Sequence, residues 1–280
     1  MALQREIWIN DIVEGLFADN TFAARSIDHS QFVNNRTVHV PNAGAAPSVV
    51  MNRSELPAEI KHRTDIDLTY LIDEFTSDPI HIPNAETVEL SYDKRQSVLS
   101  QMKAALADQV HTNLLKKWAN DALYSTGAAA MPTSIKDLVL TAQQHMNADD
   151  IPQTGRCLML NAEAYTKLLK ELTGSQGNAF SHTADAAKGT VGNLFGFDVY
   201  LRSRLATIEA GDVYAMFWQA QSVSRALGST EVFMNDGDAA WYGDILSALV
   251  RAGGSRVRAD KKGVEVYYID APAPTPAPQP

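Results

Sequence analysis

Apolar residues recur every three or four positions in two stretches of the chain, and this spacing predicts amphipathic helices. One stretch is 5–17, whose apolar face is formed by Ile9, Ile12, Val13, Leu16 and Phe17. The other runs from about 88 to 124 and carries Leu99, Met102, Leu106, Val110, Leu114 and Trp118. At a rise of 1.5 Å per residue, roughly thirty residues of helix extend about 45 Å, so we expect this helix to act as a structural spar.

Between these helices, residues 34–84 show a β-type pattern with few apolar side chains. Short extended runs at 37–41, 67–72 and 79–83 are bounded by prolines or polar turns, which is typical of edge strands. The charged stretch between the first two runs carries Arg53, Lys61 and Arg63. Because the segment has too little apolar surface for a core of its own, we expect contacts outside it to order it.

The pattern becomes mixed α/β after residue 133. Helix N-caps are predicted at Ser134 and Asn161, because their side chains accept hydrogen bonds from the free backbone N–H groups of a first helical turn. Short apolar runs predict strands at 156–160, 197–201, 213–218 and 264–269. The polar residues 174–189 predict a flexible loop. Residues 271–280 hold five of the twelve prolines and predict an extended segment that joins no core.

The composition excludes several classes of protein. Of the 280 residues, 45% are hydrophobic, which is too many for a wholly disordered chain. Cys157 is the single cysteine, so an internal disulfide and a multi-cysteine zinc site are both impossible. No apolar run is long enough to cross a bilayer and the first residues do not resemble a signal peptide, so we expect a soluble intracellular protein. The net charge of −9 argues against tight binding of nucleic acid over the whole surface.

The usual signatures of catalysis are missing. The sequence contains no G-x-S-x-G, G-x-G-x-x-G, Walker A or H-E-x-x-H motif. No two of the seven histidines are four residues apart, which disfavours a helical metal site. Cys157 lies in an apolar run and is expected to be an inert core residue, whereas His111 is expected at a surface or an interface. We therefore predict no catalytic residues, no metal and no cofactor.

Charge is distributed unevenly between the two ends of the chain. Residues 1–30 carry five acidic and two basic side chains. Residues 251–262 carry one acidic side chain, Asp260, and the basic residues Arg251, Arg256, Arg258, Lys261 and Lys262. Two separately solvated faces would produce this pattern, and so would two surfaces that pair between subunits.

The order of these parts resembles that of one family. A terminal helical arm, a long hairpin poor in apolar residues, a spar helix and a mixed α/β body follow one another in the major capsid proteins of tailed bacteriophages, which share the Hong Kong 97-like fold. Residues 156–165, RCLMLNAEAY, resemble the strand-then-helix unit of these proteins. Residues 189–200, GTVGNLFGFDVY, resemble their G…G-F-x-V step into a strand. The resemblance covers about residues 20 to 270.

The resemblance implies an α+β fold divided into five parts. Residues 1–33 would form an N-terminal arm and residues 34–84 an extended E-loop hairpin. Residues 85–155 would form a peripheral domain with its spine helix, to which the chain returns at 230–270. Residues 156–229 would form an axial α/β domain, and residues 271–280 a Pro-rich tail.

The resemblance also implies a function. Many copies, as hexamers and pentamers, would assemble into an icosahedral shell around packaged double-stranded DNA, which they would touch through weak non-specific contacts. Scaffolding, portal and decoration proteins would be further partners, and the protein would reside in the virion capsid after assembly in the host cytoplasm. The candidate inter-subunit contacts are Arg53, Lys61, Arg63, Arg251, Arg256 and Arg258. Two alternatives stay open: an encapsulin-type nanocompartment shell protein, and a soluble α/β hydrolase-like enzyme.

Overall fold

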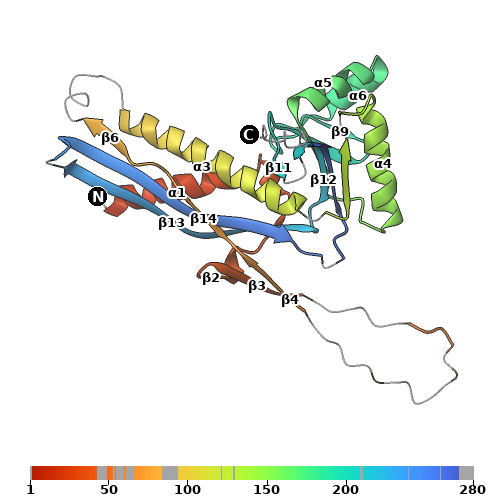
Figure 1. Ribbon diagram of the computed structural model, residues 1–280, viewed down its shortest axis with the longest axis horizontal. Helices are drawn as coiled ribbons and strands as arrows, with labels where there is room; N and C mark the ends of the chain where they lie inside the picture. Colours follow the sequence, from red (N-terminus) through yellow and green to blue (C-terminus); the bar gives the residue numbers. More distant parts are fainter. Residues whose placement is uncertain are drawn as a thin grey trace, which may run out of the picture.

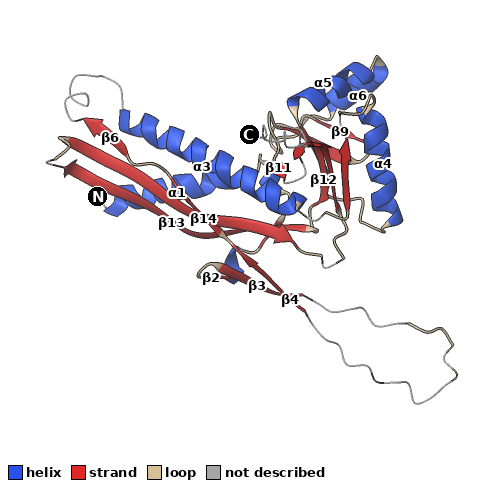
Figure 2. Ribbon diagram, in the orientation of Figure 1, coloured by secondary structure: helices blue, strands red, loops and turns tan. Residues whose placement is uncertain are grey.

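One long helix joins two β-sheets, and a third, small sheet projects from near their junction (Figure 1). The computed structural model describes residues 2–42, 49–52, 54, 60, 66–83, 94–120, 122–128, 130–208, 211–238, 240–258 and 260–270. The long helix is α3 (Lys94–Ala119), and α1 (Ala2–Leu16) packs beside it. Figure 2 shows that a long β-hairpin lies with these two helices at one end, while shorter helices gather around a second sheet at the other.

The first sheet is built on the antiparallel hairpin of β13 (Val223–Asp238) and β14 (Gly243–Arg256). The short strand β1 (Ile27–Asp28) pairs with β13 in parallel. Strands β5 (Asp73–Thr76) and β6 (Ile80–Pro83) pair antiparallel with β14. Segments from the beginning of the chain therefore flank a hairpin from near its end, and the five-stranded sheet is complete only when these distant segments meet.

Helix α3 packs its apolar stripe onto this sheet, as its residue spacing predicts. Leu106 and Val110 are 4% and 2% exposed and share one core with Val232 and Leu246 of the hairpin. Ile12 of α1 enters the same core. The two helices and the hairpin thus form one packed layer pair, in which α1 and α3 lie on the sheet.

The second sheet has the strand order β7-β15-β12-β8-β10-β9, with β11 paired to β12. Its strands are β7 (Tyr124–Ala128), β8 (Arg156–Leu160), β9 (Gly192–Leu194), β10 (Phe197–Leu201), β11 (Thr207–Ile208), β12 (Gly211–Gln219) and β15 (Val264–Asp270). The helices packed on one of its faces are α4 (Ile135–Ala148), α5 (Ala162–Glu171) and α6 (Ser175–His182). All five residues of β8 are buried, which agrees with the core strand predicted there.

The opposite face of the second sheet packs against the last turns of α3. Trp118 of α3 is fully buried, with its ring centroid 5.9 Å from that of Trp218 on β12. Its indole N–H donates a 2.8 Å hydrogen bond to the carbonyl oxygen of Ser224 in β13. Because α3 packs on the first sheet with its earlier turns and on the second with its last turns, it fixes the two sheets relative to each other.

The third sheet consists of β2 (Val33–Asn34), β3 (Thr37–Asn42) and β4 (Ile66–Leu71), all antiparallel. It extends away from the body (Figure 1). A small core at its base contains Val38, Ile72 and Ala226 of β13, each fully buried. The strands predicted around 37–41 and 67–72 are confirmed, and body residues do contribute to the core at their base.

The glycine-rich stretch 189–200 serves a turn and a close contact. Phe195 and Gly196, with φ of 49° and 83°, are the two residues between paired strands β9 and β10, and a tight hairpin turn requires such positive φ values. Gly189 also has a positive φ, and a Cβ there would overlap the carbonyl oxygen of Asn20. The stretch therefore lets the N-terminal segment approach the second sheet closely.

One local prediction is wrong, and one pair of strands has no counterpart among the predicted elements. Residues 174–189 contain helix α6, which is anchored by the single buried side chain Phe180, too little to give a periodic signal. The hairpin β13–β14 was not predicted as strands, because polar residues and the glycines Gly253 and Gly254 interrupt its alternation. Its order comes from the helices packed on it.

The chain also passes between the two sheets more often than the five-part division expected from the sequence. Residues 264–270, grouped there with the long helix, form β15 in the second sheet between β12 and β7. Strand β7 and helix α4, from the stretch 85–155, pack in that sheet's layers as well. The hairpin β13–β14 is the part of 230–270 that lies against α3.

Replacing Leu106 by Asp should destabilise the subunit strongly, because the carboxylate would be buried without a partner in the core between α3 and the hairpin. A loss of several kcal/mol, on the order of 3–5, is expected in chemical denaturation. The matched control is Ala105→Asp, one residue earlier on the exposed face of the same helix, which should stay near wild type. Equal stability of the two variants would contradict the packing described here.

Candidate assembly surfaces

The three candidate contact arginines near the end of the chain lie on β14 or just after it. Arg251 on β14 pairs with Glu74 on β5, with Nε 2.9 Å from Oε2. Arg258 donates two hydrogen bonds to Asp260, at 3.0 and 2.6 Å, which lower the pKa of that carboxyl to about 2. Arg256 ends β14 and is half-buried.

The other three candidates, Arg53, Lys61 and Arg63, lie outside the described residues. Their place in the sequence is between β3 and β4. The structure therefore fixes where this segment leaves the body and where it returns.

A basic groove of about 510 Å³ lies where the end of α3, the base of β4 and the end of β14 meet. Its basic lining residues are Lys117, Arg256, Arg258 and Lys261. Leu71 at its edge is 63% exposed, which is unusual for a leucine beside charged groups. Sequence analysis found Arg256 and Arg258 but missed Lys117, which comes from a different helix and pairs with Asp73 at 3.2 Å. Cationic side chains around an exposed apolar residue suit contact with another protein surface.

Among the described residues, no ion pair joins the acidic side chains of 1–30 to the basic side chains of 251–262. Asp28 lies 3.6 Å from Arg225 on the neighbouring strand β13, and Lys262 pairs with Asp149 at 2.8 Å. Asp28 and Lys262 thus have partners close by in the fold. The charge contrast stays available for contacts between subunits.

The segment that follows α1 is fastened to the body by polar contacts. The Arg225 guanidinium donates hydrogen bonds to the carbonyl oxygens of Ala23 and Ser26, at 2.8 and 3.0 Å. His29 is 4% exposed, and its Nδ1 lies 3.3 Å from the hydroxyl oxygen of Tyr70 on β4. Burial lowers the pKa of His29 against the opposing effect of Asp28. The N-terminal segment and the base of the projecting sheet are therefore fixed together.

His111 of α3 holds the end of α1. Its Nε2 lies 2.6 Å from the carbonyl oxygen of Leu16, the last residue of that helix, and its ring meets that of Phe22 edge-on at 5.1 Å. Burial is the main cause that lowers its pKa; Arg202 lowers it further, and the Leu16 carbonyl and Asp108 oppose the shift. The sequence placed His111 at a surface or an interface, and the contact it makes is internal.

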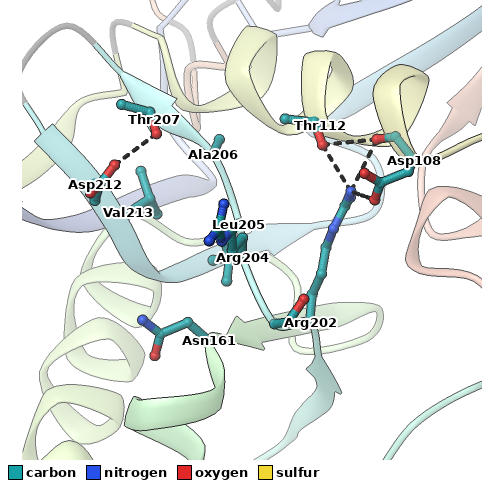
Figure 3. A pocket seen from close by; sticks show the side chains of 11 residues that line it. Asp108, Thr112, Asn161, Arg202, Arg204, Leu205, Ala206, Thr207, Asp212 and Val213 are labelled. Atoms are coloured by element: carbon teal, nitrogen blue, oxygen red, sulfur yellow. Dashed lines mark hydrogen bonds and ion pairs between the residues drawn. The ribbon is translucent and has the colours of Figure 1, made fainter. Parts of the chain in front are cut away.

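A second pocket, of about 620 Å³, lies between α3 and the second sheet (Figure 3). Arg202, just after β10, reaches across to α3, where its Nη2 lies 2.5 Å from Asp108 Oδ1 and 2.8 Å from Thr112 Oγ1. Among the described residues that line this pocket there is no histidine or cysteine, so it holds no nucleophile with a neighbouring imidazole base. Arg202 thus connects α3 to the second sheet through hydrogen bonds.

Exposed aromatic side chains gather at the far end of the long hairpin. Trp241 and Tyr242, in the turn between β13 and β14, are 61% and 80% exposed, and Phe233 is 45% exposed. The Trp241 ring centroid lies 6.0 Å from that of His81. An apolar group of this kind marks an interaction surface, and sequence analysis missed it because the hairpin itself was not predicted.

Two features of the described residues bear on other functions. Across the described stretches there is no group of three or more His, Cys, Asp or Glu side chains placed to hold a metal ion. Within the same residues, no helix is both long and apolar enough to span a membrane.

Comparison with solved structures finds the same fold in phage particles. A chain from the capsid of Ralstonia phage GP4 matches with a TM-score of 0.68 over 94% of this chain and 92% of that one, at 12% identity. A chain of Mycobacterium phage Che8 gives 0.66 over 89% and 90%, at 21% identity. A chain from the capsid of a native GTA particle gives 0.64 over 91% of each, at 15% identity.

No protein-family model matches the chain, and no curated protein matches it by sequence. The structural matches nevertheless cover nearly all of it. The chain has the Hong Kong 97-like α+β fold of these phage capsid structures, which confirms the fold that the sequence resemblance implied.

Acid should loosen the N-terminal segment, because His111 and His29 both have pKa values below that of a free histidine. The unfolded segment takes up protons below about pH 6.5 and the folded one resists them, so stability is full above that pH and falls as the pH drops through it. Hydrogen exchange of the α1 amides, corrected for intrinsic rates, measures this loss. His111→Gln keeps an N–H donor for Leu16 without titrating and should make the profile shallower, with the contribution of His29 left; an unchanged profile would contradict the assignment.

Proposed function

We propose that this protein is the major capsid protein of a tailed phage, which assembles into an icosahedral shell enclosing double-stranded DNA. The observation that carries the proposal is the match of about nine-tenths of the chain to capsid structures such as that of Ralstonia phage GP4. The elongated shape supports it, because a tile needs a stiff body and segments that reach its neighbours. We also propose that the chain has no enzymatic role and acts through assembly.

The parts of the fold take the following proposed roles. Residues 1–33 act as the N-terminal arm, and residues 34–84 act as the E-loop hairpin that lies on a neighbouring subunit. Helix α3 with the β13–β14 hairpin forms the peripheral domain, and the second sheet with α4, α5 and α6 forms the axial domain. The tie between Arg202 and α3 supports a rigid junction of these domains.

The proposed subunit contacts centre on the basic groove. Arg256 and Arg258 line it directly, and Arg251 lies nearby on β14. Arg53, Lys61 and Arg63 are proposed to reach an adjacent copy from the hairpin segment. The acidic residues of α1, such as Asp11 and Glu14, are exposed and offer charges of opposite sign on a second copy.

Further partners follow from the same proposal. Hexamers and pentamers of this chain would form the shell in the host cytoplasm, with scaffolding, portal and decoration proteins, and packaged DNA would be touched through weak non-specific contacts. The encapsulin alternative has less support, since the matched structures carry the names of phage and GTA particles. The hydrolase alternative finds no support in the pocket at Arg202, whose described lining residues include no histidine or cysteine.

The test is the size of the purified protein. A shell protein should elute from a sizing column as capsomers or as megadalton particles and show closed shells by electron microscopy, whereas an enzyme should give a small oligomer.

Arg256→Glu should prevent shell closure while the subunit keeps its fold, because the substitution reverses one charge in the basic groove. Lys188→Glu, a reversal at an exposed lysine on a different surface, should assemble normally. If Arg256→Glu formed normal shells, the basic groove would not be part of the interface between subunits.

Limited trypsin digestion tests the proposed hairpin contact. Free subunits should be cut near Arg53, Lys61 or Arg63, and assembled particles should be spared, because ordering a long core-poor segment needs a partner surface. Replacing residues 42–66 by a short Gly-Ser linker should leave a folded body that closes no shells. Equal cleavage in both states, or normal particles from the shortened chain, would contradict the hairpin's role.

A further inference from the structure

A surface groove of about 410 Å³ lies where β7 and β15 end beside the first turns of α4. Its apolar lining comes from Ala128, Ala130, Pro132, Leu138, Tyr214 and Tyr267. Asp137 is the one charged side chain among the lining residues. The groove is separate from the basic groove and from the pocket at Arg202, and it suits an uncharged occupant.

Two tyrosines form the floor of this groove. Tyr214 and Tyr267 are 3% and 7% exposed, and their ring centroids lie 6.5 Å apart at an angle of 43°. The Tyr267 hydroxyl points inward and donates a hydrogen bond to the carboxylate of Glu265. With its polar end satisfied inside the body, this ring closes the floor of the groove, and the accessible apolar lining above it comes from Ala128, Ala130 and Pro132. Paired aromatic rings beside small apolar residues are the usual setting for binding proline.

We propose that the Pro-rich segment 271–280 of the same chain docks in this groove as a polyproline II helix. Strand β15 ends at Asp270, and its residue Ile269 pairs with Ala128 at the edge of the groove. The segment therefore begins beside the site. In polyproline II form its ten residues would extend about 31 Å, which is ample to follow a groove of this size.

The chemistry of the segment fits the groove. The sequence APAPTPAPQP has no charged side chain, and its five prolines alternate with small or polar residues. A polyproline II helix makes no internal hydrogen bonds, so its carbonyl oxygens need donors from outside. The exposed hydroxyls of Thr126 and Thr133 on the groove wall supply them. Proline also restricts the free segment, which lowers the entropic cost of docking.

A nitroxide spin label on the full-length variant Thr275→Cys tests the proposal. Labelling is selective, because the one native cysteine, Cys157, is buried and has a pKa raised by burial to about 12. The label should show a slow, immobilised component whose fraction does not change with protein concentration. A component that grows with concentration would place the segment on a second copy and overturn docking within one chain.

One variant in the groove and one control outside it separate docking from general effects. Thr141→Arg projects a long charged side chain into the groove and should lower the immobilised fraction by about twofold or more. Thr166→Arg is the matched control: both threonines are exposed on helices and donate to the carbonyl four residues back, but Thr166 lies on α5 outside the groove.

Changes in the segment itself provide an independent check that leaves the body untouched. Pro274→Gly with Pro276→Gly removes the preference for polyproline II, and the label should then become mobile. A label that is mobile in the unaltered groove, or equally immobile in Thr141→Arg and in the glycine variant, would overturn the proposal.

Discussion

Burial of α3 along most of its length is the interaction on which the rest of the structure depends. Its earlier turns share a core with α1 and the β13–β14 hairpin, and its last turns enter the core beneath the second sheet. Trp118 stands at the boundary, since its ring packs against Trp218 of one sheet while its N–H bonds to Ser224 of the other. Because a close-packed helix resists bending, the two sheets behave as one stiff unit.

This stiff unit carries segments that do not build cores of their own. The N-terminal segment is fixed by His111 at Leu16 and by Arg225 farther along, and the projecting sheet starts where His29 meets Tyr70. Such an arrangement, in which a rigid scaffold directs long connecting segments outward, is how proteins place binding surfaces on loops. In a shell it would let each copy hold its neighbours while its own body keeps one shape.

The candidate surfaces differ in chemistry, which bears on how assembly could be specific. The groove around Arg256 is cationic with an exposed leucine beside it, and the turn at Trp241 is aromatic. Charged rims favour correct approach, while aromatic residues contribute much of the affinity once water is excluded. Several modest contacts of different kinds, repeated around a particle, allow a shell to form without any single tight site.

The sequence by itself determined the elements with strong periodicity and the absence of catalytic motifs. The stripe from Leu99 to Trp118, the caps at Ser134 and Asn161 and the core strand 156–160 are local properties, written in residue spacing. Only the tertiary structure decided that β13 and β14 are strands, that Lys117 lines the same groove as Arg256, and that 264–270 lies between β12 and β7. These outcomes depend on pairing and burial between segments far apart in the chain, and no local pattern encodes such contacts.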